Sequence, residues 1–124
     1  MKLIIGGAWQ GKRAFAQSAF GLKDSDIFTC VDSSIDFSAP CVEKLEEFTL
    51  ACVRAGVEPL DVFRAHEAEW ADTILICQDI FCGVVPMDAD LREWRNATGR
   101  LCQYLTARAD RVSRIFCGLE QRLK

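Results

Sequence analysis

The stretch of sequence that decides the fold is Met1-Lys2-Leu3-Ile4-Ile5-Gly6-Gly7-Ala8-Trp9-Gln10-Gly11-Lys12, in a chain of 124 residues. Its first residues are typical of a buried strand, and Gly6 and Gly11 frame four residues before Lys12, so the segment fits the GxxxxGK pattern. In that pattern backbone N–H groups curl around a di- or triphosphate, and a side chain in place of glycine would block the curl. We therefore predict a phosphate-binding loop, with a plain strand-to-helix turn as the alternative.

The predicted loop would hold a nucleotide through backbone and side-chain groups together. A helix from Lys12 to Phe20 would add the partial positive charge of its N-terminus, and the Lys12 ammonium would lie near the β- and γ-phosphates as a catalytic group. Arg13 stands where Ser or Thr would bind Mg²⁺, and a guanidinium can pair with phosphate but cannot ligate a cation. The predicted nucleotide-binding residues are Gly6, Gly7, Ala8, Trp9, Gln10, Gly11, Lys12 and Arg13.

Composition places the chain among small globular domains. Half of its residues are hydrophobic and its mass is 13.9 kDa, so we expect one domain over residues 1–124. A net charge of −3 and a pI near 5.1 predict no general attraction to nucleic acid or to an anionic membrane surface. No stretch approaches ~20 apolar residues and the N-terminus does not resemble a signal peptide, so a cytoplasmic location is expected.

The seven cysteines are expected to be reduced and buried. They form no CxxC pair and most lie in apolar stretches, which favours packed thiols over zinc ligands or disulfides.

Short apolar runs alternate with amphipathic ones, the pattern of a parallel sheet with crossover helices. We expect strands at residues 2–5, 27–31, 73–77 and 111–117. We expect helices at residues 12–20, 41–55, 59–69 and 89–109. Residues 118–124 are expected to form a short tail. The sequence therefore predicts an α/β fold with a small, mainly parallel sheet.

Ligands of such sheets bind at the carboxyl ends of the strands, so the residues there are candidates for function. Asp32 follows the second expected strand and Asp79 follows the third, and either carboxylate could hold Mg²⁺; Asp79 is the better candidate because its strand is more apolar. The alternative is that each aspartate caps a loop. Other residues are interpreted structurally: His66 as a surface histidine, Glu43, Glu46 and Glu47 as a solvated helix face, Trp94 and Leu101 as core, and Arg92 and Arg95 as cations that could reach an anionic ligand.

A second set of residues lies at fixed spacing in the second half of the chain. It comprises Gln78-Asp79-Ile80-Phe81-Cys82-Gly83-Val84-Val85-Pro86, Arg92, Arg95, Gly99-Arg100, Gln103, Ala109-Asp110, Val112, Gly118-Leu119 and Lys124. Together with Gly6-Gly7-Ala8 and Gly11-Lys12, this set resembles the adenosylcobinamide kinase/adenosylcobinamide-phosphate guanylyltransferase family. That family reads roughly TNEVGxGxVP, then xRxFRDxxGRxNQxLAxxAD, then VxGxPxxLK, and its phosphate loop reads GGARSGKS. The spacing fits without a gap, and the similarity covers the first ~20 and the last ~50 residues, with a divergent middle.

The resemblance implies a P-loop, RecA-like three-layer sandwich, a role in cobalamin biosynthesis and association of subunits, commonly as a trimer. It implies two reactions. One phosphorylates the cobinamide side-chain hydroxyl with ATP or GTP and Mg²⁺; the other transfers GMP from GTP to that phosphate through a guanylylated histidine.

The chain departs from the family pattern where the chemistry lies. Trp9-Gln10 replaces Arg-Ser, Arg13 replaces the Mg²⁺-binding Ser, Asp79 replaces Glu and Cys102 replaces Asn. The HHRxxRP segment with the histidine nucleophile has no counterpart, because the chain between Lys12 and Cys77 is tens of residues too short and could have lost the second or the third strand of the family. Guanylyl transfer is therefore not expected.

Three hypotheses follow for the function. The chain could be a shortened member that still phosphorylates adenosylcobinamide, with Lys12 neutralising phosphate charge and Asp79 or Asp32 positioning Mg²⁺. It could instead be a degenerate member that binds a nucleotide or another anion without catalysis, as a binding or regulatory subunit. In the third hypothesis the loop is structural, and the chain is a scaffold that assembles through its long helix.

Overall fold

A six-stranded sheet forms the centre of the computed structural model, which describes all 124 residues. The strand order is β2-β3-β4-β1-β5-β6, and every neighbouring pair is parallel except β5 and β6. This arrangement confirms the α/β fold class and the mainly parallel sheet of a P-loop, RecA-like fold. The strands are β1 (Lys2–Gly6), β2 (Ile27–Thr29), β3 (Cys41–Glu43), β4 (Ile74–Gln78), β5 (Arg111–Phe116) and β6 (Leu119–Arg122).

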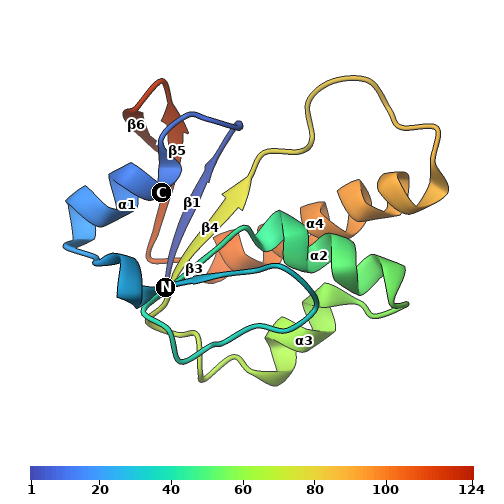
Figure 1. Cartoon of the computed structure of the whole chain (residues 1–124), viewed down its shortest axis with the longest axis horizontal. Helices are drawn as coiled ribbons and strands as arrows, with labels where there is room; N and C mark the ends of the chain where they lie inside the picture. The colour runs from blue at the N-terminus through green and yellow to red at the C-terminus, as the bar shows by residue number, and fades with distance from the viewer.

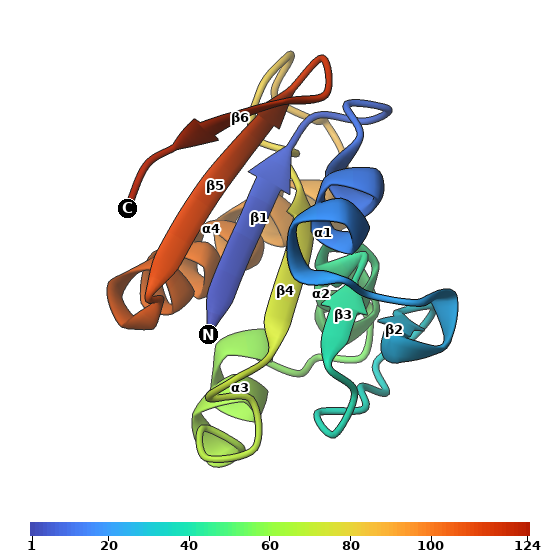
Figure 2. The same ribbon diagram turned by 90° about the vertical axis from the view of Figure 1, so that its left-hand side faces the viewer.

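Helices cover both faces of the sheet and make the three layers (Figure 1). Helix α1 is the single α-helix on one face, while α2, α3 and α4 cover the opposite face (Figure 2). The helices are α1 (Lys12–Phe20), α2 (Leu45–Arg54), α3 (Pro59–Ala65) and α4 (Ala89–Arg108), with a short 3-10 turn, η1 (Asp24–Asp26).

Alternating strand residues build one core on each face, because successive side chains of a strand point to opposite sides. Leu3 and Leu75 belong to the larger cluster of 16 buried residues, which they share with α2, α3 and α4. Ile4 and Ile76 belong to the smaller cluster of 6 residues under α1. Residue Leu101 is in the larger core as expected, whereas Trp94 is only half-buried. The larger core fixes α2 and α4 against the sheet, and with them the walls of the site described below.

The expectation of one helix over residues 41–55 is wrong in its first turn. Cys41–Glu43 is strand β3, inserted between β2 and β4, and α2 begins only at Leu45. Lys44 adopts a left-handed conformation with φ 59° and separates the two elements. The three β3 residues are buried, and pairing with β2 and β4 gives their backbone groups partners in the sheet. The chain therefore has two strands between α1 and α2 where the sequence indicated one.

The expected tail after residue 117 is also wrong, because Leu119–Arg122 pairs with β5 as the antiparallel edge strand β6. The two residues of the hairpin turn, Cys117 and Gly118, have φ values of 49° and 77°. Two consecutive positive φ values define a type I′ turn, which joins antiparallel strands. Cysteine is rare at its first position, so the sequence carried little sign of this hairpin.

Two smaller expectations are corrected. Helix α3 ends at Ala65, and His66 caps it rather than lying inside it. Of the seven free cysteines, Cys30, Cys41, Cys52 and Cys77 are buried as expected, Cys102 is half-buried, and Cys82 and Cys117 are exposed. Burial raises the pKa of Cys30 to about 12, so this thiol stays protonated.

None of the helices has the length and apolarity that crossing a membrane requires.

We expect Gly6→Ala to destabilise the protein, because a Cβ at Gly6 would lie 2.5 Å from the backbone oxygen of Ile115 on β5. The strands would have to separate, at a cost of about 2–3 kcal/mol. Urea unfolding measures this cost. Gly7→Ala is the matched control, since the nearest atom there is the Gln10 Cγ at 3.5 Å, and its stability should change by less than about 1 kcal/mol. Equal stability of the two variants would contradict the proposed close approach.

Candidate functional site: the cavity of the glycine-rich loop

The loop between β1 and α1 offers unpaired backbone donors. Gly11 has φ 94° and Trp9 has φ 62°, and these left-handed conformations turn the chain back into α1. None of the N–H groups of residues 7 to 11 donates to a protein acceptor. Such groups at a helix N-terminus are the usual ligands of phosphate.

Two neighbouring segments hold this loop in place. The backbone N–H of Gly118 donates to the Gln10 carbonyl at 2.9 Å. In the same turn, the N–H of Cys117 donates to the Gln10 Oε1 at 2.6 Å. On the other side, the N–H of Asp79 donates to the Gly6 carbonyl at 2.8 Å. The hairpin that the sequence did not predict is therefore what anchors the loop.

The loop borders a cavity of about 580 Å³ at the carboxyl edge of the sheet. Residues 8–14 and Gln17 form the side nearest α1. The opposite side comes from the end of β3, the start of α2 and the end of β4, through Glu43, Lys44, Glu46, Ile76 and Gln78. All predicted loop residues from Ala8 to Arg13 line this cavity, which has the volume of a small-molecule site.

Lys12 lies folded over the loop. Its ammonium is partly buried and donates to the carbonyl of Gly7 at 2.7 Å. This contact holds it close to the unpaired N–H groups of the loop. Burial lowers the pKa of Lys12, while the negative charges of Glu46 and Asp79 act in the opposite direction. The ammonium thus lies against the glycine-rich loop, in contact with the Gly7 carbonyl.

Arg13 lines the cavity and pairs with carboxylates. Its guanidinium donates to Glu43 on β3 and, at 3.0 Å, to the Asp24 Oδ1 in η1. Glu43 also accepts from the Thr29 hydroxyl at 2.7 Å, and Asp24 accepts from the Gln17 amide at 2.8 Å. The guanidinium holds the pKa of the Asp24 carboxyl below its usual range. Arg13 therefore ties α1 to η1 and to the end of β3.

Glu43 and Glu46 are the site residues that the sequence interpretation missed. They are only 8% and 7% exposed, so the expectation of a solvated helix face is wrong for both, whereas Glu47 is exposed. The Glu46 Oε2 accepts from the backbone N–H of Gln78 at 2.9 Å, and its Oε1 has no donor. A continuous helix would have put all three glutamates on one face; a strand ending at Glu43 separates them. The sequence held no local signal for Glu43, because it did not reveal the strand that ends there.

The two predicted metal carboxylates lie outside the cavity lining. Asp79 follows β4, and its carboxylate accepts from the backbone N–H of Phe81 at 3.0 Å. Asp32 follows the edge strand β2 and lies in a separate surface hollow beside Glu47 and Arg54. Its carboxylate accepts from the N–H of Ser34 at 2.7 Å. Both aspartates cap their own loops, and no group of three or more His, Cys, Asp or Glu side chains is arranged to hold a metal ion.

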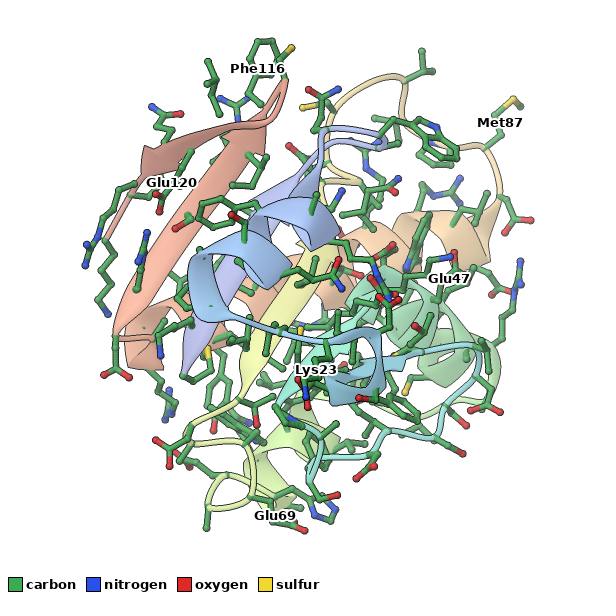
Figure 3. The ribbon with its side chains drawn as sticks, turned by 60° about the vertical axis from the view of Figure 1, so that its left-hand side comes forward. Lys23, Glu47, Glu69, Met87, Phe116 and Glu120 are labelled. Carbon is green, nitrogen blue, oxygen red and sulfur yellow. The ribbon has the colours of Figure 1, made fainter.

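The remaining candidates lie away from the loop. His66 stacks on Phe37 with ring centroids 5.0 Å apart and hydrogen-bonds to Glu69. Arg92 donates to the carbonyl of Pro86 at 3.1 Å, and Arg95 donates to that of Val84 at 3.2 Å. These two arginines tie the segment between β4 and α4 to the helix. In that segment Met87 projects outward, as does Phe116 at the tip of the hairpin (Figure 3).

We expect Arg13→Ala to lower the free energy of unfolding by about 1–3 kcal/mol, because it leaves the buried Glu43 carboxylate without its cation. The double variant Arg13→Ala/Glu43→Gln should be more stable than Arg13→Ala, since it removes the unpaired charge. Urea denaturation of the single and double variants at pH 7 measures the coupling. Simple addition of the two single costs would show that the pair is not coupled.

Comparison with protein families supports the resemblance found in the second half of the chain and extends it to earlier residues. A search of curated proteins found no match. The family model described as cobinamide kinase / cobinamide phosphate guanyltransferase matches residues 42–123, about two thirds of the chain. The match includes Glu43 and Glu46, in the part that was expected to be divergent, and it does not include the loop of residues 6–13. The chain belongs to the cobinamide kinase / cobinamide phosphate guanyltransferase family.

Proposed function

We propose that the chain binds ATP or GTP in the cavity of the glycine-rich loop. The observation that carries the proposal is the combination of unpaired N–H groups at residues 7 to 11 with the Lys12 ammonium beside them. On binding, the ammonium exchanges the Gly7 carbonyl for the β- and γ-phosphates, and the backbone of Gly7 to Lys12 cradles them. A role in cobalamin biosynthesis, which family membership implies, gives this nucleotide a use.

The reaction that we propose is phosphorylation of adenosylcobinamide. The bond from the γ-phosphorus to the nucleoside diphosphate breaks, a bond to the side-chain hydroxyl of the corrinoid forms, and the hydroxyl proton passes to solvent or a carboxylate. Lys12 neutralises the charge that develops on the phosphoryl oxygens. The negative charge of Asp79, which follows β4, raises the pKa of Lys12 and so favours its charged form.

Guanylyl transfer is not part of the proposal. The family's route needs a nucleophilic histidine, and the one histidine of this chain, His66, is stacked on Phe37 at the end of α3. No residue of the loop cavity is a histidine.

A second candidate function is nucleotide or anion binding without catalysis, in a binding or regulatory subunit. The pairing of Arg13 with Glu43 and Asp24 favours it, because a guanidinium occupied by two carboxylates supplies neither a metal ligand nor a phosphate contact. We further propose, from the family resemblance, that subunits associate as a trimer. Exposed apolar side chains such as Met87 and Phe116 are available for contact with another subunit or with a corrinoid (Figure 3).

Calorimetric titration of ATP and GTP into the wild type and Lys12→Ala tests the proposal. We expect micromolar binding by the wild type and a loss of about 10-fold or more in Lys12→Ala, because one charge-assisted contact to phosphate is removed. Lys23→Ala, an exposed lysine before η1, is the control and should bind as the wild type does (Figure 3). Absence of nucleotide binding by the wild type would refute nucleotide binding in both candidate functions. Binding without phosphorylation of adenosylcobinamide would favour the second.

As pH rises, nucleotide affinity should begin to fall at a lower pH than it would if Lys12 had the pKa of an unperturbed lysine. Only the protonated ammonium attracts phosphate, so affinity is complete below the pKa of Lys12 and is lost above it. Because burial lowers this pKa from 10.5, the loss begins at a lower pH. Titrations above pH 8 measure the effect, and Lys12→Arg, whose guanidinium stays protonated, should retain its affinity across that range. An identical pH profile for the two proteins would contradict the assignment.

A further inference from the structure

We propose that Glu46 holds the divalent cation that accompanies the nucleotide, a Mg²⁺-class ion, so that a carboxylate on α2 replaces the hydroxyl missing at Arg13. The inference rests on the proposed nucleotide binding. Glu46 lines the cavity, and it is neither part of the loop pattern nor one of the two aspartates predicted from the sequence to hold Mg²⁺.

The first support is the way in which the Glu46 side chain is held. The residue is 7% exposed and borders the loop cavity. The N–H of Gln78, at the end of β4, donates to its Oε2 at 2.9 Å and fixes the carboxylate, while its Oε1 has no donor. The backbone carbonyl of Glu46 accepts from the Trp94 indole at 2.8 Å, which fastens the start of α2 to α4. A carboxylate that is oriented by a hydrogen bond and keeps one oxygen without a donor is suited to contribute one ligand to a cation.

The second support is the balance of charge in the cavity. Its charged lining residues are Lys12, Arg13, Lys44, Glu43 and Glu46. Arg13 neutralises Glu43, and among the neighbouring carboxylates Glu46 has the largest favourable effect on the Lys12 ammonium. When Lys12 turns to the phosphates, Glu46 is left as a buried anion beside a polyanion. A divalent cation between the carboxylate and the phosphate oxygens removes this repulsion.

The other carboxylates fit the cation less well. Glu43 also has one oxygen without a donor, because Arg13 and the Thr29 hydroxyl both donate to its Oε1, but its charge is already neutralised by the Arg13 guanidinium. Asp79 caps the N–H of Phe81, Asp32 lies beside α2 in another hollow, and neither lines the cavity. Mg²⁺ is commonly held by one or two carboxylates together with substrate phosphates and water, so a single protein carboxylate is sufficient.

Titrations of ATP with excess Mg²⁺ and with EDTA, in the wild type and Glu46→Gln, test the proposal. Mg²⁺ should tighten binding to the wild type about 10-fold or more, which is about 1.4 kcal/mol. In Glu46→Gln the effect of Mg²⁺ should fall below about 2-fold, and metal-free binding should equal or exceed that of the wild type, because a buried negative charge has been removed. Glu47→Gln is the matched control: its carboxylate is the next on α2 but is exposed, so the Mg²⁺ effect should persist (Figure 3).

A second measurement needs no variant. In the wild type bound to ATP, substoichiometric Mn²⁺ should broaden the amide resonance of Gln78, whose N–H contacts Glu46, more strongly than those of Phe81 and Ser34. The amides of Phe81 and Ser34 report in the same way on Asp79 and Asp32. Stronger broadening at either of these, or an undiminished Mg²⁺ effect in Glu46→Gln, overturns the inference. Wild-type binding that is indifferent to Mg²⁺ also overturns it while sparing nucleotide binding, and no binding in either condition refutes the proposed function with it.

Discussion

The close approach of β1 to β5 at Gly6 is the constraint on which the rest of the site depends. Because a Cβ at this position would lie 2.5 Å from the Ile115 carbonyl oxygen, only glycine lets the central strand stay paired up to the point where the loop begins. The loop therefore leaves the sheet between the ends of β4 and β5 and is held from both sides, by Asp79 and by the hairpin turn at Cys117 and Gly118. Its unpaired N–H groups owe their position to these neighbours.

Charge compensation organises the opposite wall of the cavity. Two glutamates that are more than nine-tenths buried lie three residues apart, and a different interaction stabilises the buried carboxylate of each. Glu43 is paired with Arg13, so the residue that replaces the usual hydroxyl also stabilises the end of β3. Glu46 has a backbone N–H and the nearby charge of Lys12. This difference leaves one carboxylate structurally occupied and the other free to meet a ligand.

Membership of the family is carried by the part of the chain that builds this wall. The matched residues, 42–123, run from β3 to the end of β6, and they contain the carboxylates and the hairpin but not the loop itself. The loop and the family-specific half were recognised by independent features of the sequence, and the fold joins them at one cavity. The two reactions that the resemblance implies make different demands: phosphoryl transfer depends on positioning and charge neutralisation, whereas guanylyl transfer through a histidine requires a nucleophile.

The sequence by itself determined the α/β class, the loop from Gly6 to Arg13, helix α1 and helix α4, because glycine spacing and apolar periodicity are local properties of the chain. It did not reveal β3, which is three residues long, or β6, whose residues are all exposed, since neither carries a local period. The tertiary structure alone decided that Glu46 lines the cavity, that Asp32 does not, and that Arg13 faces Glu43. These outcomes depend on pairing between segments far apart in the chain, and the burial of a charged side chain is set by the neighbours that the fold brings to it.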